Sequence, residues 1–193
     1  RMVKMGDKVR KKNGQYPLYD LPRIRTLREL VELKYRSCPR KTAFSYSDRL
    51  GNKVSKTFGD VYHNINTLES WMDTQGIQNR HIALIGENSY LWLITFFAIV
   101  NGGNVVIPVD KGLQKGEIVS LMKKADVTMV FCSKFCKEGF LGEEGIECVS
   151  FEEVEKLCHI MGKVEDKWII EEDGNDGIHK KENRIKNDDV DKI

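Results

Sequence analysis

Apolar residues recur every three or four positions in two early segments, which predicts two amphipathic helices. The first begins at the capping box Thr26–Glu29, turns its apolar residues at 27, 30 and 31 toward the core, and stops before Pro39. The second opens at Thr57–Asp60, repeats apolar residues as far as Met72 and ends at Gly76. Between them, two short strands at 42–46 and 53–56 flank a turn-rich stretch.

From His81 onward, short apolar runs alternate with helical patterns. Strands are expected at 81–85, 105–109, 127–132 and 147–149. Helices are expected at 90–100, at 113–125, and from the capping box Ser150–Glu153 to Gly162. The helix at 113–125 is expected to turn four side chains inward, namely Ile118, Leu121, Met122 and Ala125. Because the strands are apolar on both sides, this order predicts an α/β fold, a mostly parallel sheet flanked by helices on both faces.

Composition divides the chain into three parts. Residues 1–19 form a basic N-terminal arm, residues 20–162 the α/β subdomain, and residues 163–193 a polar linker or surface excursion. The basic cluster in the arm (Lys8, Arg10, Lys11 and Lys12) is a solvated charge run, with a binding role as the alternative. From Glu171 onward few large apolar residues remain, so this stretch cannot bury enough surface to order itself alone.

Charge and cysteine usage exclude several classes of protein. The net charge of +2 gives no electrostatic case for nucleic acid as the main partner. The five cysteines are irregularly spaced, which argues against a zinc site or a disulfide framework and favours a reducing cytoplasm. Cys132 and Cys136 are four residues apart; we expect ordinary reduced thiols, and the alternative is that the two form a redox pair. The first residues contain no apolar stretch that could serve as a signal peptide, and the longest apolar run, 90–100, is far shorter than the ~20 residues that span a membrane.

Candidate chemistry centres on the turns that follow the strands, where ligands bind in open α/β sheets. The turn Gly86–Ser89 precedes a helix whose N-terminus attracts anions, but with one glycine and the acidic Glu87 it favours a structural turn. Asp110, at a strand end, either caps the next segment or contacts a ligand, and capping is favoured. The four histidines (His63, His81, His159 and His179) are not spaced as paired metal ligands. The sequence contains no P-loop and no nucleophile elbow, and we assign no catalytic, cofactor-binding or metal-binding residue.

The order of four segments resembles the AMP-forming adenylating enzymes, which include acyl-CoA synthetases, peptide-synthetase adenylation domains and luciferases. Residues 21–30 (LPRIRTLREL) look like the entry helix of the long-chain fatty acid-CoA ligase branch. Residues 55–61 (SKTFGDV) occupy the place of the first short family motif, and residues 82–92 (IALIGENSYLW) that of the following strand-turn-helix. Residues 101–110 (NGGNVVIPVD) resemble the second motif, a glycine-ended helix followed by a strand that closes with Pro-x-Asp. The resemblance covers about 20–162.

This resemblance implies the N-terminal subdomain of a larger enzyme. The Ser/Thr/Gly-rich loop that holds ATP phosphates in the family has no counterpart here, although residues 188–193 resemble the lead-in to it. In a parent enzyme a carboxylate, a fatty acid in that branch, would attack the α-phosphate of ATP; a thiol such as CoA would then take the acyl group, with Mg²⁺ and cationic side chains stabilising the phosphates. The implied cofactors are therefore ATP, Mg²⁺ and CoA for the parent and none for this fragment, to which no catalytic residue of the family is carried over.

Two alternatives remain beside this interpretation. One is a non-catalytic protein-interaction module with the same fold, and the other is a small flavodoxin-like nucleotide-binding domain. If the fragment lacks its partner subdomains, apolar helix faces and a sheet edge are exposed, so self-association is expected.

Overall fold

Four strands of the computed structural model form one parallel sheet in the order β4-β3-β5-β6. The strands are β3 (His81–Ile85), β4 (Val105–Val109), β5 (Val127–Cys132) and β6 (Glu147–Ser150). The structure describes residues 22–165 except 49, 135–136, 138 and 140–144, and the side chains only as far as 160. The predicted N-terminal arm, and the linker beyond 165, lie outside the described residues.

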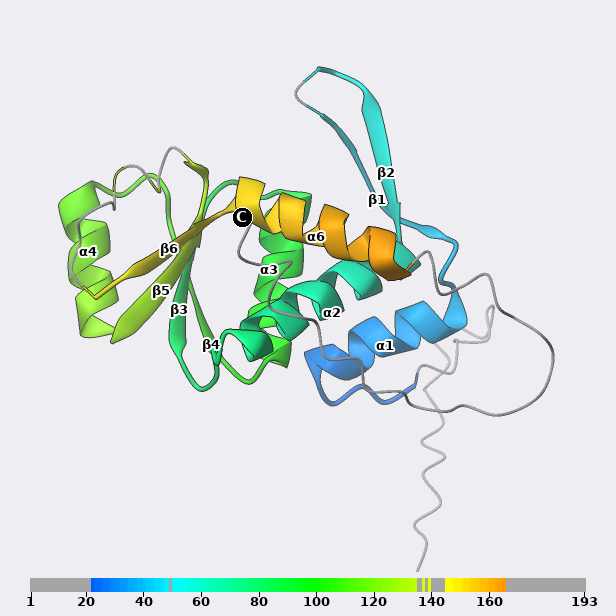
Figure 1. The fold of residues 1–193 in the computed structure, drawn as a ribbon, viewed down its shortest axis with the longest axis horizontal. Coiled ribbons are helices and arrows are strands. Elements are labelled where there is room, and N and C mark those ends of the chain that lie inside the picture. The colour runs from blue at the N-terminus through cyan, green and yellow to red at the C-terminus, as the bar shows by residue number, and fades with distance from the viewer. Residues whose placement is uncertain (1–21, 49, 135–136, 138, 140–144, 166–193) are drawn as a thin grey trace, which may run out of the picture.

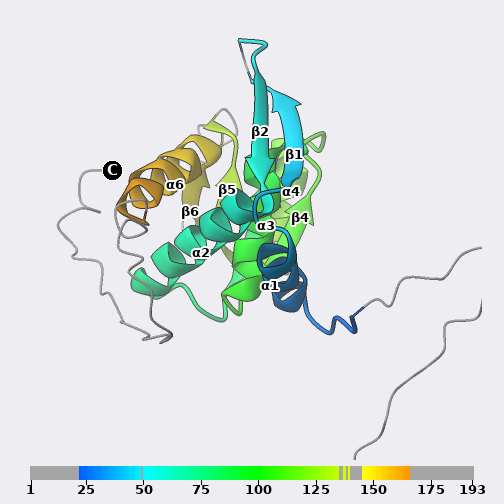
Figure 2. The same ribbon diagram turned by 90° about the vertical axis from the view of Figure 1, so that its right-hand side faces the viewer.

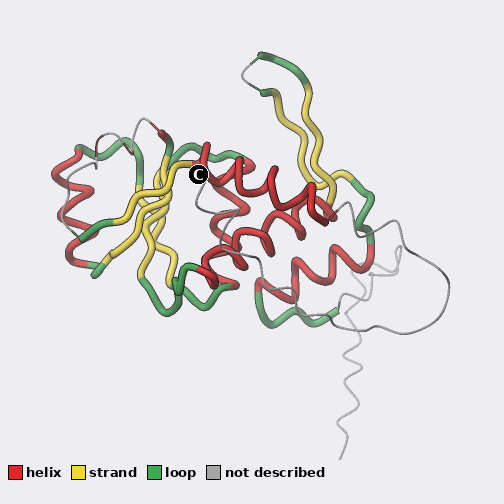
Figure 3. The backbone as a smooth tube through the Cα atoms, in the orientation of Figure 1, coloured by secondary structure: helices red, strands yellow, loops and turns green. Residues whose placement is uncertain are grey.

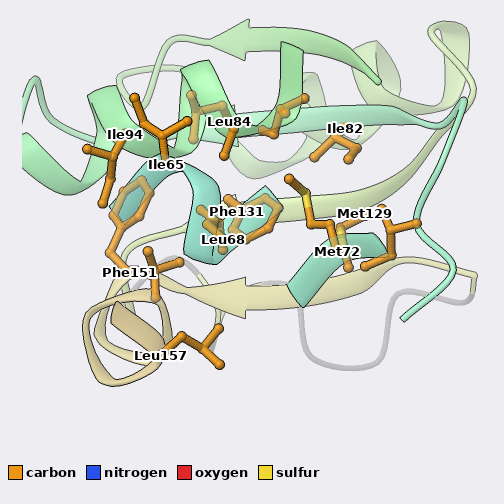
Figure 4. Close-up of a cluster of buried hydrophobic side chains, with 14 of the residues drawn as sticks. Ile65, Leu68, Met72, Ile82, Leu84, Ile94, Met129, Phe131, Phe151 and Leu157 are labelled. Carbon is orange, nitrogen blue, oxygen red and sulfur yellow. The ribbon is translucent and has the colours of Figure 1, made fainter. Parts of the chain in front are cut away.

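Helices cover the two faces of this sheet unequally, as Figures 1 and 3 show. One face carries α2 (Phe58–Thr74), α3 (Tyr90–Asn101) and α6 (Phe151–Glu165), and the other carries α4 (Lys115–Lys124). The first face holds the larger core, in which Ile65, Leu84 and Phe131 have no solvent exposure (Figure 4). The predicted α/β fold with helices on both faces is confirmed.

The helix starts follow from short polar signals in the sequence. Thr57 caps α2 in a complete capping box with Asp60, and Ser150 pairs in the same way with Glu153 at the start of α6. At the first turn of α1 (Leu27–Ser37), Thr26 accepts from the backbone N–H of Glu29 at 3.1 Å as expected. The reciprocal bond differs from the prediction, because the Glu29 carboxylate accepts from the backbone N–H of Arg25 at 2.6 Å.

Asn104 joins the two connections at the amino ends of β3 and β4. This side chain is 7% exposed; its amide oxygen accepts from the N–H of Arg80 at 2.9 Å and its amide nitrogen donates to the carbonyl of Ile77 at 3.2 Å. These bonds satisfy backbone groups that would otherwise be buried without a partner. They fix the neighbouring loops, and hence the register in which His81 lies opposite Val105 and Ile85 opposite Val109.

A two-stranded hairpin and α1 complete the described fold at the outside of the helical layer. The antiparallel strands β1 (Thr42–Ser47) and β2 (Lys53–Thr57) project away from the other elements in both ribbon views (Figures 1 and 2). At the tip, Asp48 accepts from the backbone N–H groups of Leu50 and Asn52 at 2.9 and 2.8 Å. The bounds of both strands agree with the expected ranges to within a residue.

Three expectations about helices are wrong. Leu121 is 44% exposed instead of facing inward, because α4 contacts the sheet through Ile118 and Met122. In α1, Leu27 is 38% exposed instead of facing the core, although Val31 packs against the core as expected, because this helix lies on α2 and α3 and not on the sheet. Finally, α6 continues past Gly162 to Glu165, since a single helical glycine costs only about 1 kcal/mol.

Candidate functional site

The carboxyl ends of β3 and β4 lie side by side and form an open hollow of about 510 Å³. It is lined by Gly86, Glu87, Asn88, Trp92, Pro108, Val109, Asp110 and Lys111. The structure therefore brings together the two places that the sequence singled out, the turn after β3 and Asp110 after β4. This edge is where open α/β sheets bind ligands, which makes the hollow the candidate functional site.

Gly86 at the start of the turn has a packing role. A Cβ atom built on Gly86 would lie 2.5 Å from Cε2 of Phe151, the first residue of α6, which is itself 7% exposed. Only glycine allows this approach, so the turn is fixed against the core. The contact gives a structural reason for the glycine.

Ser89 is the N-cap residue of α3. Its hydroxyl oxygen accepts from the N–H of Trp92 at 3.1 Å, and its carbonyl accepts from the N–H of Leu93 at 3.1 Å. The first-turn donors of α3 are thus partly satisfied within the helix, which weakens their attraction for an external anion.

Glu87 and Lys111 form an ion pair across the hollow. The hydrogen bond and positive charge of Lys111 hold the pKa of the Glu87 carboxyl below its ordinary value. Both side chains are exposed, so solvent screens the pair and its contribution to stability is small. A polyphosphate in this hollow would be repelled by the Glu87 carboxylate, and Lys111 is already paired with that carboxylate.

Asp110 closes the turn that follows β4. Its carboxylate accepts from the backbone N–H of Gly112 at 2.8 Å, and its carbonyl accepts from the N–H of Leu113 at 3.3 Å. The side chain therefore folds back on its own loop, in the capping geometry that the sequence favoured over a ligand contact.

The histidines and thiols form no further site among the described residues. His81 hydrogen-bonds the carbonyl of Ala125 at 2.6 Å through Nδ1, and no group of three potential metal ligands gathers within the described ranges. Burial raises the pKa of the Cys158 thiol to about 12 and also raises that of Cys148, so neither is activated as a nucleophile. Cys132 is buried, and Cys136 and His179 lie outside the described residues.

A second hollow, of about 450 Å³, lies in the helical layer between α1, α2 and the end of α3, near the segments that lead into β3 and β4. There the Arg28 guanidinium donates to the Glu69 carboxylate and to the carbonyl of Asn101. These contacts link three helices, while the second carboxylate oxygen of Glu69 and the side-chain oxygen of Asn101 are buried there without a hydrogen-bond partner among the described residues.

The sequence did not identify Trp92 and Lys111 as residues of the first hollow. Each lies within two or three residues of a turn that was singled out, but their meeting depends on the β3–β4 pairing. A lysine directly after a strand-end aspartate is the signal that could have pointed to the second of them.

A family profile described as AMP-binding enzyme matches residues 31–191, well over half of the chain. The chain belongs to the AMP-binding enzyme family. This match confirms, at the level of the family, the resemblance drawn from the four sequence segments. It argues against the alternative of a flavodoxin-like domain. A search of curated proteins gives no significant match.

Solved structures share the fold of this AMP-binding enzyme chain. VinN superposes with a TM-score of 0.62 at 18% identity, over 73% of this chain and 38% of VinN. The N-terminal subdomain of NpsA from Klebsiella oxytoca gives 0.59 at 13% identity, over 70% and 34%. The fatty acid AMP ligase from Legionella pneumophila gives 0.57 at 11% identity, over 68% and 24%. The chain thus spans well under half the length of these structures, and such identities establish the fold alone.

No helix within the described residues is long and apolar enough to cross a lipid bilayer.

Proposed function

We propose that this chain is the N-terminal part of an AMP-forming acid–thiol ligase of the acyl-CoA synthetase type, acting in the cytoplasm. The observation that carries the proposal is the family match over residues 31–191, together with a fold shared with adenylate-forming enzymes. In the whole enzyme a carboxylate oxygen attacks the α-phosphate of ATP and pyrophosphate leaves; the sulfur of CoA then takes the acyl group and AMP leaves.

The role of this chain in such an enzyme is that of a scaffold. Its strand-end hollow provides one wall of a cleft, with Gly86 fixed by Phe151 and Glu87 paired with Lys111. The described residues do not fit a triphosphate, because the Glu87 carboxylate lines the hollow and Lys111 is already paired with it. The groups that bind ATP, Mg²⁺ and CoA therefore belong to the remainder of the enzyme, which is the proposed partner of this fragment.

We propose a fatty acid as the acyl substrate. The support is the segment at 21–30, which resembles the long-chain ligase branch, and one similar structure is that of a fatty acid AMP ligase. Other structures of the same fold contain L-aspartate, in VinN, and 3-hydroxyanthranilyl-AMSN, in NpsA. A test of the substrate must therefore include all three acid classes.

The test is acid-dependent exchange of labelled pyrophosphate into ATP by the longest protein that carries this chain. We expect exchange with long-chain fatty acids, none with L-aspartate or 3-hydroxyanthranilate, and thioester formation after addition of CoA. Exchange with one of the other acids alone would overturn the fatty acid assignment but keep the reaction. No exchange with any acid would overturn the enzyme and favour a non-catalytic protein-interaction module with the same fold.

A further inference from the structure

The second hollow is walled by three helices and lined mainly by polar side chains. Helix α1 lies beside α2 and the end of α3 in both ribbon views (Figures 1 and 2), and the hollow opens between these helices. Its described lining carries the carboxylates of Glu69 and Asp73 against the single cation of Arg28. The lining is therefore negatively charged, which favours a cationic ligand.

Two oxygen atoms at this hollow accept no hydrogen bond from the described residues. They are Oε2 of Glu69 and Oδ1 of Asn101, both buried, and both residues line the hollow. Buried polar atoms in folded proteins are nearly always paired, because a buried acceptor without a donor is costly. This pair of oxygens is suited to a ligand that carries several N–H groups.

Arg28 satisfies only part of this set of acceptors. Its Nη2 donates to Oε1 of Glu69 and to the backbone carbonyl of Asn101. A free guanidinium can meet a carboxylate through two parallel N–H bonds, one to each oxygen. The side chain of Arg28 is 44% exposed, so solvent screens its ion pair with Glu69, and exchange for another cation costs little.

The rest of the lining suits a second positive charge and a short alkyl chain. Asp73 lies one turn beyond Glu69 on α2, which places the Cβ atoms of the two residues about 6 Å apart. Asp73 is exposed, and its Oδ1 accepts from Gln78. Tyr62 and the buried Ile77 line the same hollow and offer apolar contact to an alkyl chain between the two carboxylates.

We propose that the second hollow binds a small free dication in which a short alkyl chain joins a guanidinium to a primary ammonium. The guanidinium takes the place of Arg28 and donates to both carboxylate oxygens of Glu69 and to Oδ1 of Asn101, and the ammonium pairs with Asp73. With Arg28 turned into solvent, the two charges of the ligand balance the two carboxylates. The strand-end hollow lies at the other end of β3 and β4, so this site goes beyond the proposed function and does not depend on it.

The test is isothermal titration calorimetry of the 193-residue chain with agmatine, with the fold checked by circular dichroism. We expect saturable binding with a Kd below about 1 mM. A dication of the same chain length without N–H groups, 1,4-bis(trimethylammonio)butane, should bind about tenfold or more weakly, because it cannot donate to the buried oxygens. No saturable binding of agmatine, or equal binding of the two dications, would overturn the proposal.

A third probe, acetylarginine amide, represents an arginine side chain of another protein. It should bind more weakly than agmatine, because it lacks the second cation that Asp73 would pair with. Tighter binding of acetylarginine amide would assign the acceptors to a protein arginine and overturn the free dication.

Two matched pairs of variants place the ligand in the hollow. Arg28→Met removes the competing cation and should tighten agmatine binding about threefold or more, whereas Arg36→Met, on the same helix outside the hollow, should leave it unchanged. Glu69→Gln should weaken binding about tenfold or more, and Glu155→Gln, at an exposed position of α6, should have no effect. Weaker binding by Arg28→Met, or equal responses within either pair, would overturn the proposal. If circular dichroism shows that Glu69→Gln does not fold, the arginine pair decides alone.

Discussion

Helices α2 and α3 pack on the same face of the sheet but have opposite outer surfaces. Both bury aliphatic side chains with no exposure, such as Leu68 in α2 and Ile94 in α3. Outward, α2 carries charged residues such as Glu69, whereas α3 contains no charged residue. The inner sides are alike because one core specifies both. The outer sides differ because α2 is contacted there by α1, whose Arg28 pairs with Glu69, whereas the outer α3 face, formed by Trp92, Phe96 and Phe97, is half-buried beside the core.

The largest expected effect is the same in both helices and lies on their inner sides. Leu68→Ala and Ile94→Ala each remove a side chain with no exposure and should lower the free energy of unfolding by about 2–5 kcal/mol. Urea denaturation followed by circular dichroism measures both. A loss in α2 with little loss in α3 would mean that α3 does not belong to this core.

A smaller effect is expected at the turn that sets the position of α3. Gly86→Ala brings a Cβ to 2.5 Å from the buried ring of Phe151, and the required shift should cost about 1–3 kcal/mol of unfolding free energy. The matched control is Gly116→Ala in α4, where a Cβ meets no atom within 4 Å. The control should be neutral or stabilise by up to about 1 kcal/mol. Equal thermal stability of the two variants would remove the packing explanation for the turn.

The outer surfaces should differ in association and not in folding. We expect the 193-residue chain to self-associate at high concentration through the outer α3 face, because this face is apolar and only half-buried in the fragment. Phe96→Glu should reduce the apparent mass measured by light scattering, and Leu121→Glu should leave it unchanged. A wild-type chain that stays monomeric at every concentration would contradict the expected self-association through α3.

The smallest effect concerns pH and the start of α6. Burial raises the pKa of Glu153, but the Lys137 ammonium at 2.7 Å and the hydrogen bonds from Ser150 outweigh it, so the pKa lies below the ordinary 4.5. A lowered folded-state pKa stabilises the fold above the unfolded-state value, and this contribution disappears as pH falls through the folded-state value. Glu153→Gln should therefore flatten the loss of stability below pH 4.5 in acid titrations followed by circular dichroism. An unchanged slope would show that this carboxylate does not contribute.

The bounds of the helices and strands were predicted better than the packing of other elements against them. Strand β4 was placed at its observed bounds because a double glycine and an aspartate flank an apolar run, and the Thr57 and Ser150 caps are local signals. The exposure of Leu121 was missed because it depends on which elements cover α4. The buried amide of Asn104 was missed because its partners belong to a different loop.

The candidate site was predictable only in part for the same reason. The strand-end turns could be named from glycine and capping residues, but the hollow needs the pairing of β3 with β4, which brings Trp92 and Lys111 together. The half-burial of the outer α3 face was likewise not predicted, since an apolar helix suggests full burial and the sequence does not show what covers it.

The central claim is that this chain supplies scaffold and not the nucleotide site of an AMP-binding enzyme. Isothermal titration calorimetry of the 193-residue chain with ATP and Mg²⁺ tests it most directly, with the fold checked in the same sample by circular dichroism. We predict no saturable heat at millimolar nucleotide. Binding with a micromolar Kd would contradict the account and place the phosphate site within these residues.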